Sequence, residues 1–405
     1  MLRLARMASG LRVAILGTRG IPAAYGGFET FAEQLAVRLA GRGHDVTVFG
    51  RRGAIDPALD GTRYRGVRLI LLPAPQAKHL ETVVHTLAAA WRARRERFDF
   101  ALVCNSANFL ALPVVGAGGA RTALAIDGIE SARRKWGVLG RSFYRMAARL
   151  GPLLADVVVA DCHVIEEHYR ARGVRRVEMI AYGAEPPRSA GTAALDRLGV
   201  KPGGYVLYVS RLEPENNADV VIRAYRQAAV VADLVVVGDA PYAGAYKARL
   251  RALAAGEPRV RFAGYLFGEG YDQLRAHALC YVQATDVGGT HPALLEAMAA
   301  GLPVIANDIP EHREVLADAG WYYQRNSPEA LAARLRSVLG EEGRQDGADA
   351  TVAERLRREK GAAARRRAAE HYDWDQVTSA YEQLALRLTK RNAVADPPGA
   401  TPRRA

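Results

Sequence analysis

The sequence is poor in cysteine and lacks a long apolar run. Cys104, Cys162 and Cys280 are too few and too scattered for a disulfide framework, which favours a reducing, cytoplasmic setting. No apolar stretch of signal-peptide length precedes Arg12, and the uncharged residues 100–120 are interrupted by asparagine, proline and glycine. Both a disulfide-stapled secreted domain and an integral membrane protein are therefore disfavoured.

Acidic side chains are scarce in the first half of the chain. Residues 1–186 carry 27 lysines and arginines against 16 acidic residues, whereas residues 187–405 carry 29 against 27. Most of the net charge of +13 therefore belongs to the first half, which favours a phosphate-bearing or anionic partner. Nucleic acid is disfavoured, because the sequence contains no helix-turn-helix, zinc-finger or aromatic-basic strand pattern.

Short β-branched runs alternate with amphipathic segments along nearly the whole sequence, a pattern typical of parallel α/β sheets. The first series of expected strands covers 11–17, 45–49, 67–72, 100–104, 122–127 and 157–160. A second series follows the turn-rich segment 183–204 and covers 205–209, 234–237, 261–263, 280–283 and 304–306. This repetition predicts two Rossmann-like domains with a cleft between them, over residues 11–184 and 204–370. A helix over 371–389 and a disordered tail over 390–405 complete the predicted organisation.

Glycines follow the first expected strand. Residues 17–22 (GTRGIP) and the pair Gly26 and Gly27 lead into the first helix, at the edge where open α/β sheets bind ligands. The dinucleotide fingerprint G-x-G-x-x-G is absent, so a tight structural turn is the alternative. Arg19 is an unusual choice for a purely structural turn, which makes it a candidate contact.

An arginine stands directly after the first strand of the second series. The guanidinium of Arg211 is expected to face the cleft, where its paired N–H donors suit a diphosphate that gains negative charge as it leaves. The alternative is a surface ion pair with Glu213 or Glu215.

The strongest local signal is the segment 285–305, in which a glycine-rich loop leads into a helix that begins near Pro292. Free amides at the start of that helix can hold a phosphate, while Glu296, one turn in, can accept hydrogen bonds from a ribose diol. This arrangement suits a sugar nucleotide. An ordinary helix that ends at Gly301 is the alternative.

Together these segments resemble the retaining glycosyltransferases of family 4, which have the GT-B fold. The resemblance rests on Gly26 and Gly27, on Arg211, and on Glu296 within the run EAMAAGLPV, and it extends over about residues 12–388. A narrower resemblance, to bacterial rhamnosyltransferases of surface polysaccharide assembly, rests on residues 17–22, 25–31, 127–130, 135–137 and 211–217. The family fold implies two Rossmann-like domains whose parallel sheets face a central cleft, and a last helix that crosses back to the first domain.

The resemblance also implies roles for individual residues. Arg211 would neutralise the donor diphosphate, and Glu296 would bind the nucleotide ribose. Gly26 and Gly27 would face the donor sugar and phosphate across the cleft. The backbone amides implied to line the pyrophosphate are those of Gly288, Gly289 and Thr290.

The diphosphate clamp of the family is altered in this chain. Asn216 stands five residues after the arginine, where the family usually has a lysine, and it is retained as a candidate donor contact. Arg19 or His291 is a candidate to supply the missing positive charge.

Two further positions depart from the family pattern. Gly288 stands eight residues before the helix glutamate, where an acidic residue is usual, and Asp286 lies two residues earlier. The His–Asp pair that many members present to the donor sugar is replaced by Ile126 and Asp127. Asp127 is therefore the candidate polar contact near the reaction centre.

The predicted reaction is transfer of a hexosyl or deoxyhexosyl group, with rhamnosyl favoured, from a nucleoside diphosphate sugar to a hydroxyl of a glycan or lipid-linked glycan. The resemblance implies retention of the anomeric configuration and no metal, and the sequence shows no His, Asp and Cys cluster with metal-ligand spacing. Glucosyl or mannosyl transfer is the alternative. A nucleotide-sugar epimerase comes next, although no convincing acid–base pair can be assigned to it.

The first domain is expected to hold the acceptor. Arg133, Arg134 and Lys135 beside Trp136, together with Arg19, are candidates for contact with acceptor phosphates or with an anionic membrane surface. Solvated arginine-rich faces are the alternative. The expected location is cytoplasmic, with peripheral attachment at the inner face of the plasma membrane.

Overall fold

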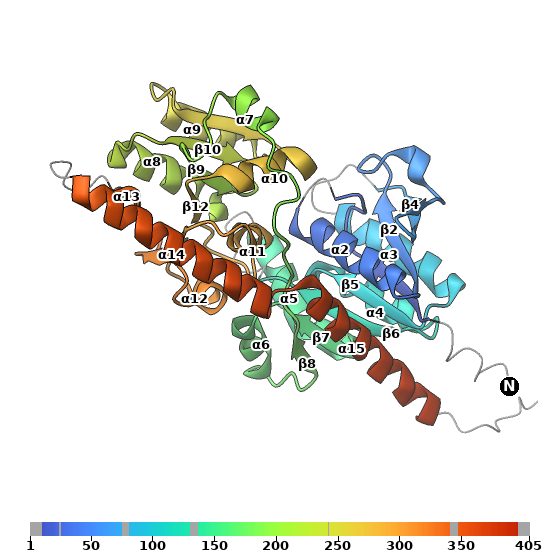
Figure 1. Cartoon of the computed structure of the whole chain (residues 1–405). Helices are drawn as coiled ribbons and strands as arrows, with labels where there is room; N and C mark the ends of the chain where they lie inside the picture. The colour runs from blue at the N-terminus through green and yellow to red at the C-terminus, as the bar shows by residue number, and fades with distance from the viewer. Residues whose placement is uncertain are drawn as a thin grey trace, which may run out of the picture.

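Two α/β lobes, joined by a double crossing of the chain, make up the computed structural model (Figure 1). It describes residues 10–23, 26–74, 81–129, 137–241, 243–340 and 347–395. We call residues 10–183 with the last helix the first lobe, and residues 185–371 the second lobe. The predicted contacts Arg133, Arg134, Lys135 and Trp136 lie outside the described residues, as does the end of the predicted tail from residue 396.

The first lobe is built on an eight-stranded sheet of order β3-β4-β2-β1-β5-β6-β7-β8. Its strands are β1 (Arg12–Leu16), β2 (Asp45–Arg51), β3 (Arg63–Tyr64), β4 (Val67–Leu72), β5 (Phe100–Cys104), β6 (Arg121–Ile126), β7 (Val157–Ala160) and β8 (Val177–Met179). All neighbours pair in parallel except β3, which is antiparallel to β4. The central strands read as continuous apolar runs because helices cover both faces of a parallel sheet.

Helices pack on both faces of this first sheet. Helix α2 (Gly27–Gly41) turns Phe31, Leu35 and Leu39 into the core at helical spacing. The opposite face carries α3 (Glu81–Glu96), α4 (Ala111–Gly116), α5 (Val138–Leu154) and α6 (His163–Arg170). Two short 3₁₀ turns, Pro57–Leu59 and Ser106–Asn108, complete the lobe.

The second lobe has a six-stranded parallel sheet of order β11-β10-β9-β12-β13-β14. Its strands are β9 (Tyr205–Val209), β10 (Asp233–Val237), β11 (Val260–Gly264), β12 (Cys280–Gln283), β13 (Val304–Asn307) and β14 (Trp321–Tyr323). Its helices are α7 (Ala193–Leu198), α8 (Ala218–Ala228), α9 (Gly244–Ala254), α10 (Gly268–His277), α11 (Pro292–Ala299), α12 (Pro310–Leu316), α13 (Pro328–Leu339) and α14 (Gly347–His371), with a 3₁₀ turn at Pro214–Asn216. The two parallel sheets predicted from the sequence are confirmed.

The chain crosses between the lobes twice, and the two crossing segments are adjacent. Helix α14 packs against α11 and α13 of the second lobe, whereas α15 (Trp374–Ala395) lies against α2 of the first (Figure 1). Between them, the amide of Ala184 donates to the carbonyl of Tyr372 at 2.8 Å. The predicted crossing helix is therefore confirmed.

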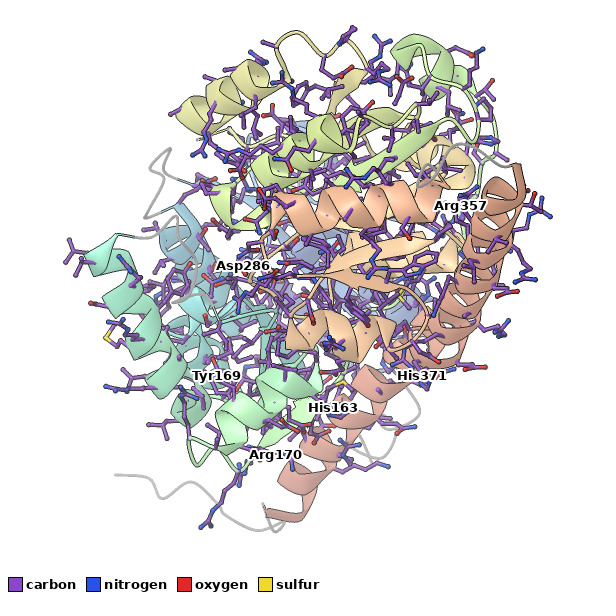
Figure 2. The ribbon with its side chains drawn as sticks, turned by 90° about the vertical axis from the view of Figure 1, so that its left-hand side faces the viewer. His163, Tyr169, Arg170, Asp286, Arg357 and His371 are labelled. Atoms are coloured by element: carbon purple, nitrogen blue, oxygen red, sulfur yellow. The ribbon has the colours of Figure 1, made fainter. Side chains whose placement is uncertain are left out.

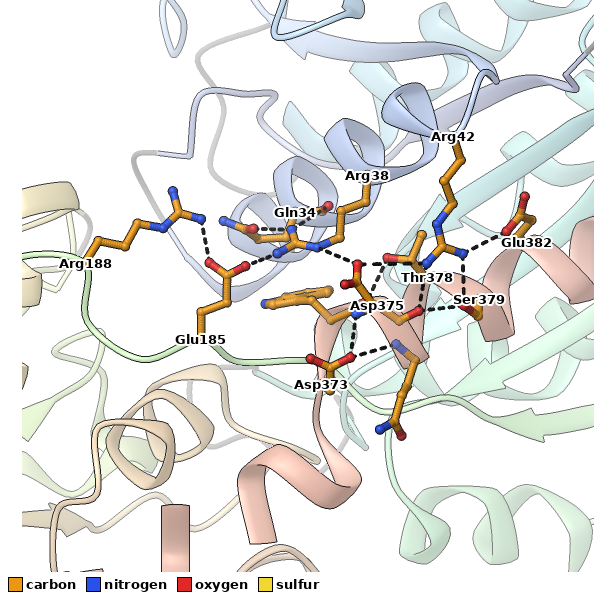
Figure 3. Close-up of polar contacts among 12 residues, drawn as sticks. Gln34, Arg38, Arg42, Glu185, Arg188, Asp373, Asp375, Thr378, Ser379 and Glu382 are labelled. Atoms are coloured by element: carbon orange, nitrogen blue, oxygen red, sulfur yellow. Dashed lines mark hydrogen bonds and ion pairs between the residues drawn. The ribbon is translucent and has the colours of Figure 1, made fainter. Parts of the chain in front are cut away.

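Two arginines, one in α2 and one directly after it, hold α15 on the first lobe (Figure 3). The guanidinium of Arg38 forms an ion pair with Glu185 and lies 5.5 Å from the ring centre of Trp374. Arg42 donates to a carboxylate oxygen of Glu382 at 2.8 Å. Helix α2, the first crossing segment and α15 are thus held by one network.

The structure differs from the sequence prediction at short or terminal elements. Strands β3, β8 and β14 were not predicted, because two or three residues at a sheet edge are too short to show a period. Helix α15 runs to Ala395, so the predicted start of the tail at Lys390 is wrong; residues 390–395 contain no proline or glycine to end the helix. In the part of the chain that the structure describes, no helix is both long and apolar enough to cross a bilayer.

Candidate functional site

A cleft of about 640 Å³ opens between the two lobes, at the carboxyl ends of both sheets. Its walls include ten residues predicted from the sequence: Arg211, Asp127, Glu296, Gly288, Gly289, Thr290, His291, Gly26, Gly27 and Asn216. These residues come from four separate segments of the chain, two in each lobe. The fold therefore brings the predicted donor loops of both lobes to one place.

Arg211 lies in the loop that follows β9. Its guanidinium lines the cleft, and one of its nitrogens lies 4.0 Å from the carboxylate of Glu213. Both arrangements considered from the sequence, a cleft-facing cation and a local ion pair, are therefore present.

Asn216 supports the loop that carries Arg211. Its side-chain nitrogen donates to the carbonyl of Arg211 at 2.7 Å, and the hydroxyl of Tyr208 donates to the carbonyl of Asn216 at 2.6 Å. Asn216 is buried, as expected for an amide that satisfies backbone groups. This bracing role differs from the direct donor contact predicted from the sequence.

Glu296 is held by two side chains of α10. The hydroxyl of Tyr271 donates to a carboxylate oxygen of Glu296 at 2.9 Å, and the guanidinium of Arg275 lies 5.0 Å from the ring centre of Tyr271. Arg275 also donates to the backbone carbonyl of Glu296 at 3.2 Å. Burial raises the pKa of Glu296, while Arg275 and the hydrogen bond from Tyr271 oppose that rise.

Because of this environment of Glu296, we expect nucleotide binding to weaken at acidic pH. Burial raises the pKa of Glu296, so the acceptor form of its carboxylate is lost as pH falls through a value above that of an ordinary glutamate. Tyr271→Phe removes a hydrogen bond to the charged form, so we expect its acidic limb to lie at higher pH than in the wild type. Titration of a nucleoside diphosphate from pH 4 to 8 measures the pH dependence of binding in both proteins. Tyr246→Phe is the matched control, because it removes a tyrosine–carboxylate hydrogen bond, to Asp219 at 2.8 Å, away from the cleft wall. Coincident pH dependence in Tyr271→Phe and the wild type would contradict the assignment.

An aspartate of the first lobe holds the glycine-rich loop of the second. Asp161 follows β7, and one of its carboxylate oxygens accepts from the amide and the hydroxyl of Thr290 at 2.9 and 3.1 Å. The amide of Thr290 is therefore engaged by Asp161, which corrects the expectation that it lines the pyrophosphate. Burial and the nearby Asp127 raise the pKa of Asp161 well above its usual range.

Glycine is required beside this contact. An ideal Cβ at Gly289 would lie 1.9 Å from the second carboxylate oxygen of Asp161. At Gly288, an ideal Cβ would lie 2.2 Å from the ring of His291. Glycine at position 289 therefore permits a close approach between the lobes, whereas a side chain at position 288 would require the ring of His291 to shift.

His291 immediately precedes α11, and Pro292 fills the first helical position. The ring of His291 lies 5.2 Å from that of His312, whose pKa is lowered by burial to about 4. The neighbour of His291 is thus neutral near pH 7.

The remaining first-lobe residues approach the cleft from α2 and β6. Gly26 precedes α2, and an ideal Cβ at Gly27 would lie 3.1 Å from Pro292 of the second lobe. Asp127 follows β6 directly and lines the cleft. Glycine at position 27 therefore lets the two lobes approach each other at Pro292, directly after the glycine-rich loop.

Two candidate residues lie elsewhere. Arg19 does not line the cleft; its amide donates to Glu29 at 2.9 Å, and its guanidinium lies 3.9 Å from Glu81. Glu81 lies closer to the guanidinium of Arg51, at 3.0 Å. The position of Arg19 away from the cleft wall corrects its prediction as a diphosphate contact, whereas its role as an acceptor or membrane contact stays a prediction. Asp286 binds the guanidinium of Arg325 at 2.7 Å and likewise does not line the cleft.

A second contact between the lobes lies beside the cleft. Glu314 of α12 accepts from the amides of His163 and Val164, at 2.7 and 3.0 Å, at the start of α6. Figure 2 labels His163 and shows α6 next to the second lobe. A carboxylate at a helix N-terminus satisfies free amides and favours the helix dipole, so this contact stabilises the apposition of the lobes.

Sequence reasoning missed Asp161, Tyr271 and Arg275. Asp161 carried a usable signal, since it follows the expected strand 157–160 at the ligand-binding edge of the sheet. Tyr271 and Arg275 are one helical turn apart, but nothing in the sequence connects them with Glu296. Their role depends on the packing of α10 beside α11.

Family models match both lobes. Residues 26–183 match the model described as "Glycosyl transferase 4-like domain", and residues 203–341 match "Glycosyl transferases group 1". Each match includes the cleft residues of its lobe that were predicted from the sequence.

Curated relatives include several mannosyltransferases. An O-antigen chain mannosyltransferase B of Escherichia coli is 27% identical over 34% of this chain and 37% of its own length. A GDP-mannose-dependent alpha-mannosyltransferase of Mycobacterium tuberculosis is 31% identical over 46% of this chain and 53% of its own. A GDP-mannose-dependent alpha-(1-6)-phosphatidylinositol monomannoside mannosyltransferase of the same organism is 28% identical over 73% and 80%. The chain thus spans about a third and about half of the length of the first two relatives.

Solved structures share the fold at low sequence identity. Sucrose-phosphate synthase from Thermosynechococcus elongatus has a TM-score of 0.75 at 18% identity, covering 94% of this chain and all of that one. The HepE protein of Anabaena in complex with UDP-glucose has a TM-score of 0.72 at 16% identity, covering 95% of this chain and all of that one. These similarities establish the arrangement of two facing lobes.

Proposed function

We propose that this chain, which belongs to the group 1 glycosyltransferases and has the GT-B fold, transfers a hexosyl or deoxyhexosyl group from a nucleoside diphosphate sugar to a hydroxyl of a glycan or lipid-linked glycan. The observation that carries the proposal is the cleft in which Arg211, the glycine loop and Glu296 meet between the lobes. This set supplies one cation, backbone donors and one carboxylate, which suits a diphosphate joined to a ribose.

The donor would lie on the second lobe. Arg211 would stabilise the charge that develops on the diphosphate as the bond to the sugar carbon breaks. The amides of Gly288 and Gly289 would add hydrogen bonds, while Thr290 stays with Asp161 and fixes the loop. The resemblance to retaining enzymes supports attack on the same face of the sugar, with a donor phosphate oxygen accepting the proton of the acceptor hydroxyl. In this scheme, protein groups stabilise the negative charge of the leaving diphosphate, and no metal is required.

Glu296 would accept hydrogen bonds from the ribose hydroxyls. The hydroxyl of Tyr271 holds the carboxylate of Glu296, and Arg275 holds its backbone carbonyl, so the side chain is oriented before the nucleotide binds. Such preorganisation lowers the entropy lost on binding.

The acceptor would enter along the first lobe. Glu33, Tyr64 and Arg65 line that wall, and the hydroxyl of Tyr64 donates to Glu33 at 3.0 Å. Polar groups of this kind suit sugar hydroxyls. The names of two relatives, an O-antigen chain and a phosphatidylinositol monomannoside mannosyltransferase, support a glycan or lipid-linked acceptor. The cytoplasmic, membrane-peripheral location stays a prediction from the sequence.

Two observations favour different sugars. The sequence resemblance around residues 17–31 and 127–137 favours rhamnosyl transfer, whereas the mannosyltransferases among the relatives favour mannosyl transfer. Thermal shifts with dTDP-rhamnose, GDP-mannose, UDP-glucose and UDP-galactose distinguish them, since ligands that bind the folded state raise its melting temperature. We expect one of the four donors to raise the melting temperature most and to release its diphosphate during incubation. No change of the melting temperature with any of the four donors would contradict the proposal.

An epimerase would share the fold but would change the sugar without an acceptor. We therefore expect the reaction products to contain no epimerised nucleotide sugar. Chromatography of each donor after incubation tests this point, and a new nucleotide sugar in the mixture would favour the alternative.

A further inference from the structure

Helix α5 leaves an apolar stripe uncovered on the first lobe. Its inner side, with Tyr144, Ala147 and Gly151, is buried against the sheet. Large apolar side chains recur on its outer side: Leu139 is 87% exposed, Met146 43%, Leu150 41% and Leu153 79%. Figure 2 shows α5 at the left edge of the molecule, with side chains directed away from it. A stripe of this size costs free energy in water unless a partner covers it.

Arginines border this stripe. Arg141, Arg145 and Arg149 are exposed and recur every four residues, so they form a row beside the apolar side chains. Helix α5 contains no aspartate or glutamate. By contrast, α14, which also carries several arginines, interleaves its cations with glutamates. The combination on α5 is typical of helices that lie in the plane of a membrane interface, where guanidinium groups reach the lipid phosphates.

We propose that α5 docks this protein on the surface of an anionic lipid bilayer. Charge complementarity selects this partner, because the helix offers three cations and no anion beside its apolar side chains. A second copy that docked through the same face would bring two arginine rows together without a carboxylate on either helix to pair with them.

The location of α5 suits an enzyme that acts on lipid-linked acceptors, an argument that rests on the proposed function. Helix α5 follows β6, and Asp127 of the cleft wall lies between these two elements in the sequence. The start of α5 therefore lies at the edge of the first sheet that opens into the cleft. Docking through this face would keep the acceptor side of the cleft close to lipid-linked substrates.

Vesicle sedimentation of the full chain tests the inference without requiring catalysis. The vesicles are pure phosphatidylcholine and an equimolar mixture of phosphatidylcholine and phosphatidylglycerol. We expect binding to the mixed vesicles, and Arg141→Gln with Arg145→Gln and Arg149→Gln should weaken it about a hundredfold, since each cation near an anionic surface contributes about a fivefold change. Leu139→Glu with Leu153→Glu should abolish binding to both kinds of vesicle.

Matched substitutions on the second lobe serve as controls. Val231→Glu with Val352→Glu changes exposed apolar side chains, and Arg355→Gln with Arg358→Gln and Arg366→Gln changes exposed cations; binding should be unchanged in both. Equal binding of wild type to neutral and mixed vesicles, or full binding by the α5 variants, would overturn the proposal. So would a dimer in light scattering that Leu139→Glu with Leu153→Glu dissociates while no vesicle is bound.

Nucleotide binding by the same preparations separates this inference from the proposed function. We expect the α5 variants to bind nucleoside diphosphate as the wild type does. If the protein binds nucleotide but not vesicles, the docking proposal is wrong and the proposed function is unaffected. If it binds vesicles but no nucleotide, the proposed function is wrong and the docking proposal is unaffected.

Discussion

Replacing Arg211 with alanine is expected to lower turnover by about 10²–10³-fold, the range found when one preorganised charge-stabilising donor is removed. The guanidinium lines the cleft beside the predicted phosphate loop, and the carbonyl of Arg211 is braced by Asn216. Because the side chain would act mainly on the leaving diphosphate, the loss should appear in kcat more than in the melting temperature. Steady-state kinetics with the donor selected by thermal shift measure this effect.

Arg249→Ala provides the matched control. This arginine of the same lobe forms an ion pair with Asp219 at 3.3 Å and does not line the cleft. Its removal should leave turnover within about twofold, as expected for an exposed ion pair. Equal turnover in Arg211→Ala and Arg249→Ala would contradict the role given to Arg211.

Gly289→Ala is expected to lower kcat/KM by about a hundredfold, because the lobes can no longer meet at the glycine loop. An added Cβ would lie 1.9 Å from one carboxylate oxygen of Asp161, and this carboxylate cannot turn aside without losing the hydrogen bonds that its other oxygen accepts from Thr290. Gly244→Ala is the matched control, since an added Cβ there meets no atom within 4 Å. Steady-state kinetics and melting temperatures compare the two variants.

Combining Gly289→Ala with Asp161→Ala tests the mechanism of this effect. Asp161→Ala alone should reduce activity, because it leaves the amide of Thr290 without its carboxylate partner. In the double variant the clash is removed, so its activity should exceed that of Gly289→Ala alone, and the two effects should not add. Purely additive losses would contradict contact between Asp161 and the glycine loop as the cause.

Much of the architecture could be predicted because parallel strands covered on both faces have a strong sequence pattern. The central strands of both sheets are continuous apolar runs, and the helices between them show apolar residues at helical spacing. Edge strands such as Arg63–Tyr64 carry no such pattern and were missed. The end of α15 was misplaced because the segment 390–395 contains neither proline nor glycine.

The cleft could be predicted only in part, because motifs reveal what lies on one loop and not what faces it. Arg211 and Glu296 were found through their positions after a strand and within a helix, and both line the cleft. The contact of Thr290 with Asp161 joins residues 129 positions apart, so no local pattern could report it. The diphosphate contact predicted for Arg19 was wrong for the same reason, since no local pattern shows that this side chain extends toward Glu81 and away from the cleft wall.

The central claim is that the cleft binds a nucleoside diphosphate through Arg211 and Glu296. Calorimetric titration of UDP, GDP and dTDP into the wild type and Glu296→Ala tests it most directly. Asp308→Ala, which removes a half-buried carboxylate paired with Arg313 away from the cleft wall, is the control. We predict that one diphosphate binds, that Glu296→Ala weakens it about tenfold or more, as expected for hydrogen bonds to a charged group, and that Asp308→Ala does not. Absence of binding by all three nucleotides, or equal affinity in Glu296→Ala and the wild type, would contradict the account.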